Sequence, residues 1–446
     1  MTAKNLRLLM ILFIVCLFCY GNAQRIRNLG DLGFAMEIID REYVRKPDKK
    51  KLYEAAMKGM IDSLDPYSSY IPSESLKPFQ AVFDQEFGGL GVSLDGPPRR
   101  ERLTIVTALF NSPAYKAGLQ PGDVILEIDG VDSEKSQVEA VSQKLRGKEG
   151  TSVSLKIERV GEPEPKELKI VRAKIEVESV LGDRRKMDGS WDFSMEADPQ
   201  IAYLRLDLFG EKTTDELKAG LTLVRGKCKG IIIDLRDNTG GLLVSAKDIC
   251  DLFLDDGDIV STRGRDNRID QRYVATPGTV IASTVPIVVM INEHSASASE
   301  VVAGCLQDRC RATVVGNRSF GKGSVQNVIP LDGGMAAMRM TTAYYYPPSG
   351  RLIHREKLAK PEDVWGVSPD EGCEVKLSEE ASMKAIERMR KRADPMENGL
   401  GRPRDASVSN AETPTEVGGQ ENFDPTLKED PQLEKAVEVL QRKLSE

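Results

Sequence analysis

Residues 200–316 carry the most regular pattern of hydrophobic and polar positions in the chain. Four runs are continuously apolar or alternate apolar with polar residues, which is typical of strands, and three runs repeat apolar residues at helical spacing. The strands are expected at 201–207, 230–235, 287–291 and 312–316. The helices are expected at 214–225, 242–254 and 298–308. Strands that alternate with helices predict an α/β layer whose apolar strands are buried.

The pattern before this layer predicts two smaller regions. Residues 52–83 have helical spacing, interrupted by a turn at 64–70, and indicate a small N-terminal helical region. Residues 87–175 contain short strands separated by glycine turns and predict a compact, mostly β domain. Its strands are expected at 91–94, 104–107, 124–128 and 152–158, and its helix at 137–145.

The pattern changes again after Arg390, where Pro, Gly, Asn, Ser, Thr and Glu dominate until about Thr426. Such a composition predicts a disordered linker over 391–426. Helical spacing returns at 433–444, so a C-terminal helix is expected within 427–446, docked on the body of the protein. The domains expected between the two ends are therefore 24–86, 87–175 and 176–390.

The N-terminus resembles an export signal. Lys4 and Arg7 precede an apolar run over 8–20, and small residues at Gly21 and Ala23 suit a cleavage site after residue 23. The run is shorter than the roughly 20 residues that span a bilayer. We expect an exported protein of the periplasm or cell envelope, with an uncleaved N-terminal membrane anchor as the alternative.

Composition narrows the classes of partner and cofactor. The net charge is −7, and cleavage of the signal would make it more negative by removing Lys4 and Arg7. Nothing therefore favours binding to nucleic acid or to anionic membranes. Five cysteines follow residue 23, an odd number without CxxC spacing, and the chain has only 2 histidines. No metal site and no cofactor are expected. The oligomeric state stays open, a homo-oligomer included.

Ser297 is the first candidate for chemistry. It follows the expected strand 287–291 and opens the expected helix at 298, where backbone N–H groups could bind an oxyanion. The alternative is structural, because Ser297 and Glu300 also fit a helix capping box.

Lys322 is the second candidate. It lies between Gly321 and Gly323 in an apolar neighbourhood, and a lysine removed from water can accept a proton near neutral pH. If the chain is extended there, Gln326 shares its face and could orient the amine. A solvated loop lysine is the alternative.

The strings NEHSASASE and GNRSFGKGSVQ resemble the active-site signature of the carboxyl-terminal processing (tail-specific) serine proteases. In that family the middle serine of SASAS is the nucleophile and a lysine 25 residues later is its base, which matches Ser297 and Lys322. A glutamine four positions beyond the lysine supports it, which matches Gln326. The resemblance implies a Ser–Lys dyad and a crotonase/Clp-protease-like α/β core.

Two further segments support this resemblance, which extends over most of 50–350 and fades beyond Arg351. Residues 63–70 resemble the family's N-terminal helical motif, with Tyr67 where histidine is common. Residues 233–242 resemble its LRNNPGG turn, with threonine in place of proline. The resemblance implies an oxyanion hole formed by the N–H of Ala298 and that of Gly240 or Gly241.

The β domain resembles a PDZ domain in two motifs. Residues 87–92 (FGGLGV) resemble its carboxylate-binding loop, and residues 117–125 (AGLQPGDVI) its most recognisable motif. Successive N–H groups of such a loop can bind a peptide's terminal carboxylate, while the peptide adds as a strand. The residues expected to bind the peptide are Gly89, Leu90, Gly91, Val92, Val138 and Val141.

The sequence therefore predicts an exported endopeptidase that captures free C-termini. Three alternatives remain: a Ser–His–Asp hydrolase with His294 or His354 as base, a catalytically inactive PDZ scaffold or chaperone, and an acyl-CoA-processing enzyme. The third rests on fold analogy alone.

Overall fold

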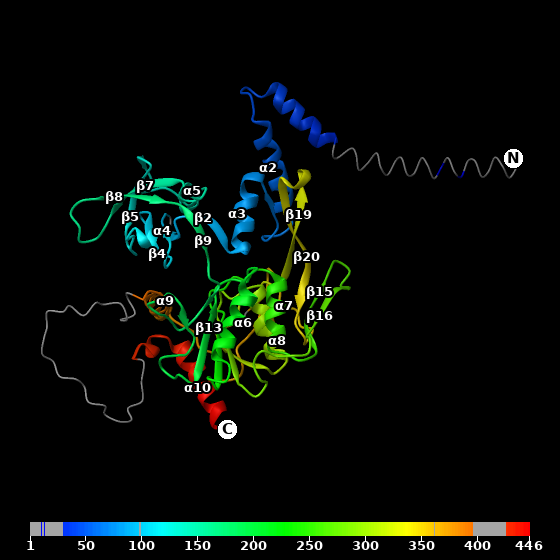
Figure 1. Ribbon diagram of the computed structural model, residues 1–446. Coiled ribbons are helices and arrows are strands. Elements are labelled where there is room, and N and C mark those ends of the chain that lie inside the picture. Colours follow the sequence, from blue (N-terminus) through cyan, green and yellow to red (C-terminus); the bar gives the residue numbers. More distant parts are fainter. Residues whose placement is uncertain (1–9, 11–12, 14–29, 98–99, 361, 396–424) are drawn as a thin grey trace. The chain divides into compact units, whose positions relative to one another are not determined.

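The computed structural model describes residues 10, 13, 30–97, 100–360, 362–395 and 425–446 (Figure 1). The chain divides into two compact units. The first comprises residues up to 76 together with 326–341, and the second comprises 77–325 and 342–446. The expected signal segment 1–23 lies outside the described residues, apart from Met10 and Phe13. No described helix is long and apolar enough to cross a membrane.

The first unit contains α2 (Lys49–Asp62) and β1 (Ser69–Ile71). β1 pairs antiparallel with β20 (Ala336–Tyr346), and β20 also pairs with β19 (Ser324–Leu331). α3 (Ser73–Asp84) begins in this unit and ends in the next. The helices expected over 52–83, and the turn between them, are confirmed.

The turn between α2 and β1 is organised by Asp65. Its carboxylate accepts hydrogen bonds from Tyr67 N at 2.8 Å, Ser68 N at 2.9 Å and Ser68 Oγ at 2.7 Å. Thr341 Oγ1 of β20 donates to the same carboxylate at 3.2 Å. Burial alone would raise the pKa of Asp65, but these hydrogen bonds hold it below its usual value. An ionised Asp65 thus ties the turn to β20.

The second unit begins with the mostly β domain, and its strands and its helix are confirmed. β2 (Glu86–Gly89) pairs with β9 (Ala173–Glu176). The remaining strands form one sheet in the order β3-β4-β5-β7-β8, with β6 against β5. They are β3 (Val92–Asp95), β4 (Thr104–Ala108), β5 (Val124–Ile128), β6 (Val131–Asp132), β7 (Ser152–Glu158) and β8 (Lys166–Val171). The helices are α4 (Pro113–Lys116) and α5 (Val138–Leu145).

The α/β layer is a five-stranded sheet in the order β10-β13-β14-β17-β18. The strands are β10 (Val180–Leu181), β13 (Ile201–Leu206), β14 (Gly230–Asp234), β17 (Ile287–Ile291) and β18 (Ala312–Gly316). All pairs are parallel except β10 with β13. The helices between these strands are α6 (Thr213–Val224), α7 (Leu243–Asp251) and α8 (Ala298–Asp308). α7 ends three residues earlier than the pattern predicted.

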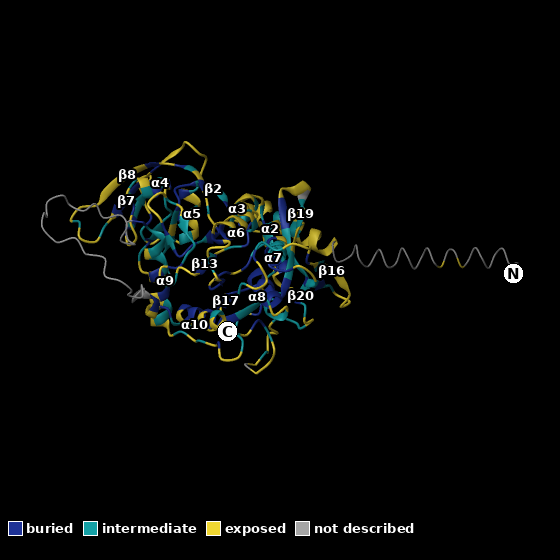
Figure 2. Cartoon of the chain, turned by 60° about the horizontal axis from the view of Figure 1, so that its bottom comes forward, coloured by how far each residue is buried: buried dark blue, intermediate teal, exposed yellow. Residues whose placement is uncertain are grey.

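Helices cover both faces of this sheet, so β14 and β17 are buried at every position. Figure 2 shows dark blue, buried segments in the region labelled β17 and α8. One face packs with α6, α7 and α8 in the larger hydrophobic cluster. The other face packs with α10 (Pro431–Ser445), which follows the 3₁₀ turn Pro425–Glu429. Burial on both faces explains why these strands are continuously apolar rather than alternating, up to Asp234 at the end of β14. The docked C-terminal helix is confirmed.

The remaining elements of the second unit flank this layer. β15 (Asp258–Arg263) pairs with β16 (Ile269–Val274) and with the end of β20, while β11 (Arg184–Arg185) pairs with β12 (Trp191–Asp192). α9 (Glu379–Ala393) continues past residue 390, where the linker was expected to begin. The rest of that linker, 396–424, lies outside the described residues.

Candidate active site

Ser297 lies at the N-terminal end of α8, directly after the loop that leaves β17. Its backbone has φ 57° and ψ −113°, a region that residues with a side chain rarely adopt. Backbone strain of this kind persists where surrounding contacts enforce it, and it is concentrated at functional sites. The side chain is buried, with 5% of the residue exposed. The local fold therefore presents a strained serine at the positive end of a helix.

Glu300 holds the Ser297 segment and the Lys322 segment together. Its Oε2 accepts hydrogen bonds from the backbone N–H of Ser297 at 2.9 Å and from that of Lys322 at 2.8 Å. Its Oε1 accepts from Ser319 Oγ at 2.5 Å and from Gly321 N at 2.7 Å. Because one oxygen binds both N–H groups, the two nitrogens lie within about 6 Å of each other.

The carboxyl of Glu300 has no exposed surface. Burial raises its pKa, and the four donors act in the opposite direction. The sequence suggested Glu300 only as the partner of Ser297 in a capping box. The hydrogen bond to Ser297 N is present, and the bonds to residues 319–322 are an additional role that helix spacing could not reveal.

The residues around Lys322 pack closely against a neighbouring segment. A side chain at Gly323 would place its Cβ 2.4 Å from His354 N, and one at Gly321 would place it 2.7 Å from Arg355 Cβ. The carbonyl of Gly321 accepts a hydrogen bond from Arg355 N at 2.8 Å. Lys322 itself is half-buried. The glycines therefore allow the close approach that the sequence suggested, although the strand β19 begins only at Ser324.

Tyr345 contacts both halves of this arrangement. Its backbone N–H donates to Gly323 O at 2.7 Å, and its phenol interacts through a hydrogen bond with the Ser297 side chain. Burial raises the pKa of Tyr345 to about 12, so the phenol stays neutral at physiological pH. Nothing in the sequence separated Tyr345 from the tyrosines on either side of it.

The glycine turn lies against Ser297, as the resemblance implied. A Cβ on Gly240 would be 2.8 Å from Ser297 Cβ and 3.0 Å from Ala298 N. Asn238 fixes this turn, because its Oδ1 accepts from Gly240 N at 2.8 Å and its carbonyl accepts from Ala296 N at 3.0 Å. Gly240 and Gly241 have φ of 103° and 149°, which favour glycine.

Gln326 belongs to the first unit, in the part of β19 that pairs with β20. Its Nε2 donates to Thr341 Oγ1 at 3.2 Å, and Thr341 Oγ1 donates to Asp65. The two segments singled out by the resemblance, the N-terminal motif and Gln326, are thus joined through one threonine.

The two histidines differ in their surroundings. His294 is exposed, and its backbone N–H bonds to Asn292 Oδ1 at 3.2 Å. His354 is half-buried: its backbone abuts Gly323, and the centroid of its ring lies 4.8 Å from that of Tyr344.

The expected carboxylate-binding loop connects β2 to β3. Gly91 has φ 76°, and its carbonyl accepts hydrogen bonds from Leu109 N at 2.8 Å and Ser112 Oγ at 3.2 Å. Gly89 ends β2, Leu90 is buried, and Val92 starts β3 opposite Ala108. The carbonyl of Gly91 is thus hydrogen-bonded within the β domain itself.

Helix α5 lies against β3, as a PDZ groove requires. A Cβ on Gly96 would meet Val138 Cγ2 at 3.3 Å. Val138 is partly exposed, but Val141 has no exposed surface and belongs to the core of the domain. Of the two valines predicted to contact a peptide, only Val138 is accessible in this structure.

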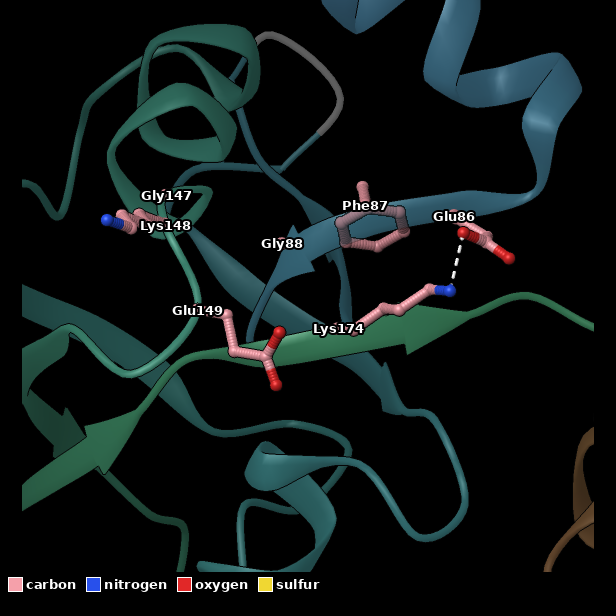
Figure 3. Close-up of a pocket in the computed structure, with 7 residues that line it drawn as sticks. All are labelled: Glu86, Phe87, Gly88, Gly147, Lys148, Glu149 and Lys174. Atoms are coloured by element: carbon pink, nitrogen blue, oxygen red, sulfur yellow. Dashed lines mark ion pairs between the residues drawn. The ribbon is translucent and has the colours of Figure 1, made fainter.

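A shallow pocket lies beside the loop (Figure 3). It is lined by Glu86, Phe87, Gly88, Gly147, Lys148, Glu149 and Lys174. Lys174 Nζ pairs with Glu86 Oε2 at 2.7 Å across β2 and β9. The carbonyl of Gly88 accepts from Gly147 N at 3.1 Å, which joins β2 to the segment after α5.

Within the described ranges no group of three or more His, Cys, Asp or Glu side chains could hold a metal ion. The five cysteines of those ranges are free thiols, of which Cys250, Cys305 and Cys373 are buried.

Comparison with known proteins identifies the family. Residues 200–372 match peptidase family S41, residues 105–159 match the PDZ domain, and residues 21–75 match the activating protease CtpB N-terminal domain. A carboxy-terminal-processing protease of Bartonella bacilliformis is 43% identical over 333 residues, which are 73% of each chain. The chain belongs to the carboxy-terminal processing proteases of peptidase family S41.

Two further carboxy-terminal processing proteases are less similar to this chain than the Bartonella protein. CtpB of Bacillus subtilis is 33% identical over 75% of this chain and 68% of its own. The solved photosystem II D1 C-terminal processing protease is 26% identical, covers 81% of this chain and 96% of its own, and superposes with a TM-score of 0.45. The predicted enzyme class, a carboxyl-terminal processing serine protease, and the predicted fold class, an α/β catalytic core with a mostly β PDZ domain, are confirmed.

Proposed function

We propose that this protein is an exported serine endopeptidase that cleaves proteins near their C-termini, with Ser297 as nucleophile and Lys322 as general base. The observation that carries the proposal is the shared Oε2 of Glu300, which fixes the backbone of both residues. Catalysis by a dyad needs the nucleophile and the base in one fixed geometry. Gln326 is proposed to orient the amine, as the resemblance implies.

In the proposed mechanism neutral Lys322 takes the proton of Ser297 Oγ as the oxygen attacks the scissile carbonyl. The tetrahedral intermediate collapses, the C–N bond breaks, and the lysine ammonium returns the proton to the leaving amine. Water then attacks the acyl-enzyme with Lys322 again as base, which releases the new C-terminus and restores Ser297.

The oxyanion of the intermediate is proposed to bind the N–H of Ala298 and that of a turn glycine. Ala298 begins α8, so its N–H lies at the positive end of the helix. Gly240 and Gly241 remain alternatives. The N–H of Gly240 donates to Asn238, which favours Gly241.

A rising pH profile is expected if Lys322 is the base. Only the neutral amine accepts the serine proton, so kcat should increase with pH through the neutral-to-alkaline range and level off once the amine is deprotonated. Steady-state kinetics on one peptide over this pH range measure the rising limb of the profile. His294→Ala and His354→Ala should both keep it, and its loss in either variant would favour a Ser–His mechanism.

Substrate capture is proposed to use the PDZ loop, with the N–H groups of Leu90, Gly91 and Val92 as donors to a terminal carboxylate. Hydrogen bonds to a charged group contribute about 1.5–3 kcal/mol each. The inward-bonded carbonyl of Gly91 fixes the loop that would present these donors. Val138 is proposed to contact the peptide side chains.

Amidation of a substrate's C-terminus should therefore weaken its capture by roughly ten- to a hundredfold. The amide removes the charge and one acceptor oxygen. Paired measurements of kcat/KM on free-acid and amidated forms of one unfolded substrate, below saturation, make the test. The loss should lie in KM if the loop only tethers, and also in kcat if occupancy aligns the dyad.

A matched protein variant is Gly91→Leu. Its Cβ would lie 2.4 Å from Ser112 Cβ at a φ that disfavours side chains, so the loop must distort. This variant should cleave the free-acid substrate as slowly as wild type cleaves the amide, and amidation should then have no further effect. Equal rates for the two substrates with the wild type would remove C-terminal recognition from the proposal.

Export and a periplasmic or envelope location are proposed from the first 23 residues. N-terminal sequencing of the protein recovered from the envelope fraction tests the cleavage site. A mature chain that begins at Gln24 supports a cleaved signal, and one that retains residue 1 supports the membrane anchor.

A further inference from the structure

Asp234, Arg236 and Asp430 form a buried ionic cluster in the second unit. Their exposed fractions are 0%, 3% and 0%. Arg236 Nε and Nη2 donate to the Asp234 carboxylate at 3.0 and 2.7 Å, while Nη1 and Nη2 donate to the two oxygens of Asp430 at 2.8 and 2.9 Å. Two-point contacts of this kind are the strongest form of ion pair. The guanidinium of Arg236 therefore binds a carboxylate that lies 194 positions away in the sequence.

Three neighbours complete the cluster. Tyr203 Oη donates to Asp234 Oδ2 at 2.7 Å, and Gln432 Oε1 accepts from Arg236 Nη1 at 3.3 Å. Arg205 lies with Nη1 3.5 Å from Asp234 Oδ2. Burial alone would raise the pKa of Asp234, but Arg236 and Arg205 hold it well below its usual range. Asp234 is therefore ionised between two guanidinium groups.

Asp430 belongs to the C-terminal segment 425–446, beyond the region that matches peptidase family S41. It caps α10, because its Oδ1 also accepts from Leu433 N at 3.1 Å. α10 packs along β14, β17 and β18. The cluster therefore fastens the start of this helix to the end of β14.

Arg236 also opens the turn that lies against Ser297. Its backbone N–H donates to Asp234 Oδ1 at 2.9 Å, so the residue is held from both the backbone and the side chain. Two residues later Asn238 O accepts from Ala296 N at 3.0 Å and from Ser299 Oγ at 2.8 Å. Ala296 and Ser299 flank Ser297 in the sequence. A displacement of Arg236 would therefore be transmitted through residues 236–238 to the chain on both sides of Ser297.

We infer that Asp430 is a positioning residue for catalysis: it locks Arg236, and through Arg236 the glycine turn beside Ser297, so that the C-terminal segment is part of the active-site support. The inference rests on the proposed function of Ser297. Small displacements in such support can reduce turnover strongly while substrate binding persists. The role is distinct from helix capping, which any Asn or Ser at position 430 could supply.

The test is Asp430→Asn in the full-length chain. Asparagine keeps the shape and the helix cap but removes the charge, which leaves Arg236 with one carboxylate. We expect kcat to fall about tenfold or more with KM within about twofold of wild type. The rising pH limb should stay in place, because Lys322 is untouched. Kinetics are measured well below the thermal midpoint, with the folded fraction set by circular dichroism.

The matched control is Asp258→Asn. Asp258 pairs with Arg272 in the same two-point manner, at 2.7 and 2.9 Å, but on the exposed β15–β16 hairpin. It should leave kcat unchanged. If Asp430→Asn lowers only the thermal midpoint and each folded molecule turns over like wild type, Asp430 is merely structural and the inference is wrong.

If Asp430→Asn is recovered unfolded, Gln432→Ala tests the positioning role in its place. It removes the 3.3 Å contact to the guanidinium together with the hydrogen bond from Gln432 Nε2 to Val375 O at 2.8 Å. We expect kcat to fall about two- to threefold, and an unchanged kcat would overturn the inference. Ser297→Ala distinguishes a failure of the proposed dyad from a failure of the positioning role of Asp430. Full activity in Ser297→Ala would refute the proposed dyad, whereas loss of activity there with normal kcat in the Asp430 variant would refute only the positioning role.

Discussion

Ser297→Ala and Lys322→Ala should each reduce peptide hydrolysis by about 10⁴-fold or more, and the double variant should be little worse than either single one. The reason is that the two side chains act as one unit: without the base the hydroxyl stays protonated, and without the hydroxyl there is nothing for the base to activate. Single-turnover kinetics on an unfolded protein substrate, followed on gels, measure all three variants against wild type.

Ser299→Ala is the natural control for this series. Ser299 lies two residues from Ser297 and is also buried, but its hydroxyl donates to Asn238 O at 2.8 Å, and Ser299 has no proposed part in the dyad. Its activity should exceed that of Ser297→Ala by orders of magnitude. Substantial activity in Lys322→Ala would transfer the base role to a histidine, and no activity in wild type would favour the scaffold alternative.

Glu300→Gln should produce the second largest effect, a loss of kcat of about a hundredfold together with a lower thermal midpoint. Each carboxylate oxygen of Glu300 accepts two hydrogen bonds. The side-chain NH₂ group of glutamine cannot accept them, so at either position it would point its own N–H groups at two hydrogen-bond donors. A buried polar group left unpaired costs about 1–3 kcal/mol of stability. Kinetics and thermal unfolding of the same preparation separate the two losses.

Glu293→Gln, in the loop that precedes α8, provides the comparison. Glu293 is exposed, and its Oε2 accepts a single hydrogen bond, from Asn317 Nδ2 at 3.1 Å. Its variant should match wild type in both measurements. If Glu300→Gln retained wild-type kcat, the shared carboxylate would not be what sets the geometry of Ser297 and Lys322.

The sequence predicted most of the fold because its patterns were unambiguous. β14 and β17 are apolar apart from Asp234 at the end of β14, since helices cover both faces of their sheet, and glycine turns separate the short strands of the PDZ domain. The boundary at residue 390 was wrong by a few positions, because the charged residues 390–392 suit both a helix end and a linker. The roles of Ser297, Lys322 and Gln326 stay predictions.

The contacts around the candidate site were harder to predict. Glu300 fits a helix cap so well that its second role, at Gly321 and Lys322, leaves no trace in spacing. Strand alternation places Tyr345 opposite its neighbours but does not say which face meets Ser297. Asp430 is separated from Arg236 by 194 positions. Each of these contacts depends on the tertiary fold, which local patterns do not encode.

The position of α10 has a consequence for biogenesis. A ribosome delivers β14, β17 and β18 well before residue 431, so one apolar face of the sheet stays uncovered until α10 has been synthesised. A chain cut short before α10 would expose a large hydrophobic surface, which favours aggregation and hinders stable folding. The support that Asp430 is inferred to give to the turn beside Ser297 would then arise only after α10 has docked.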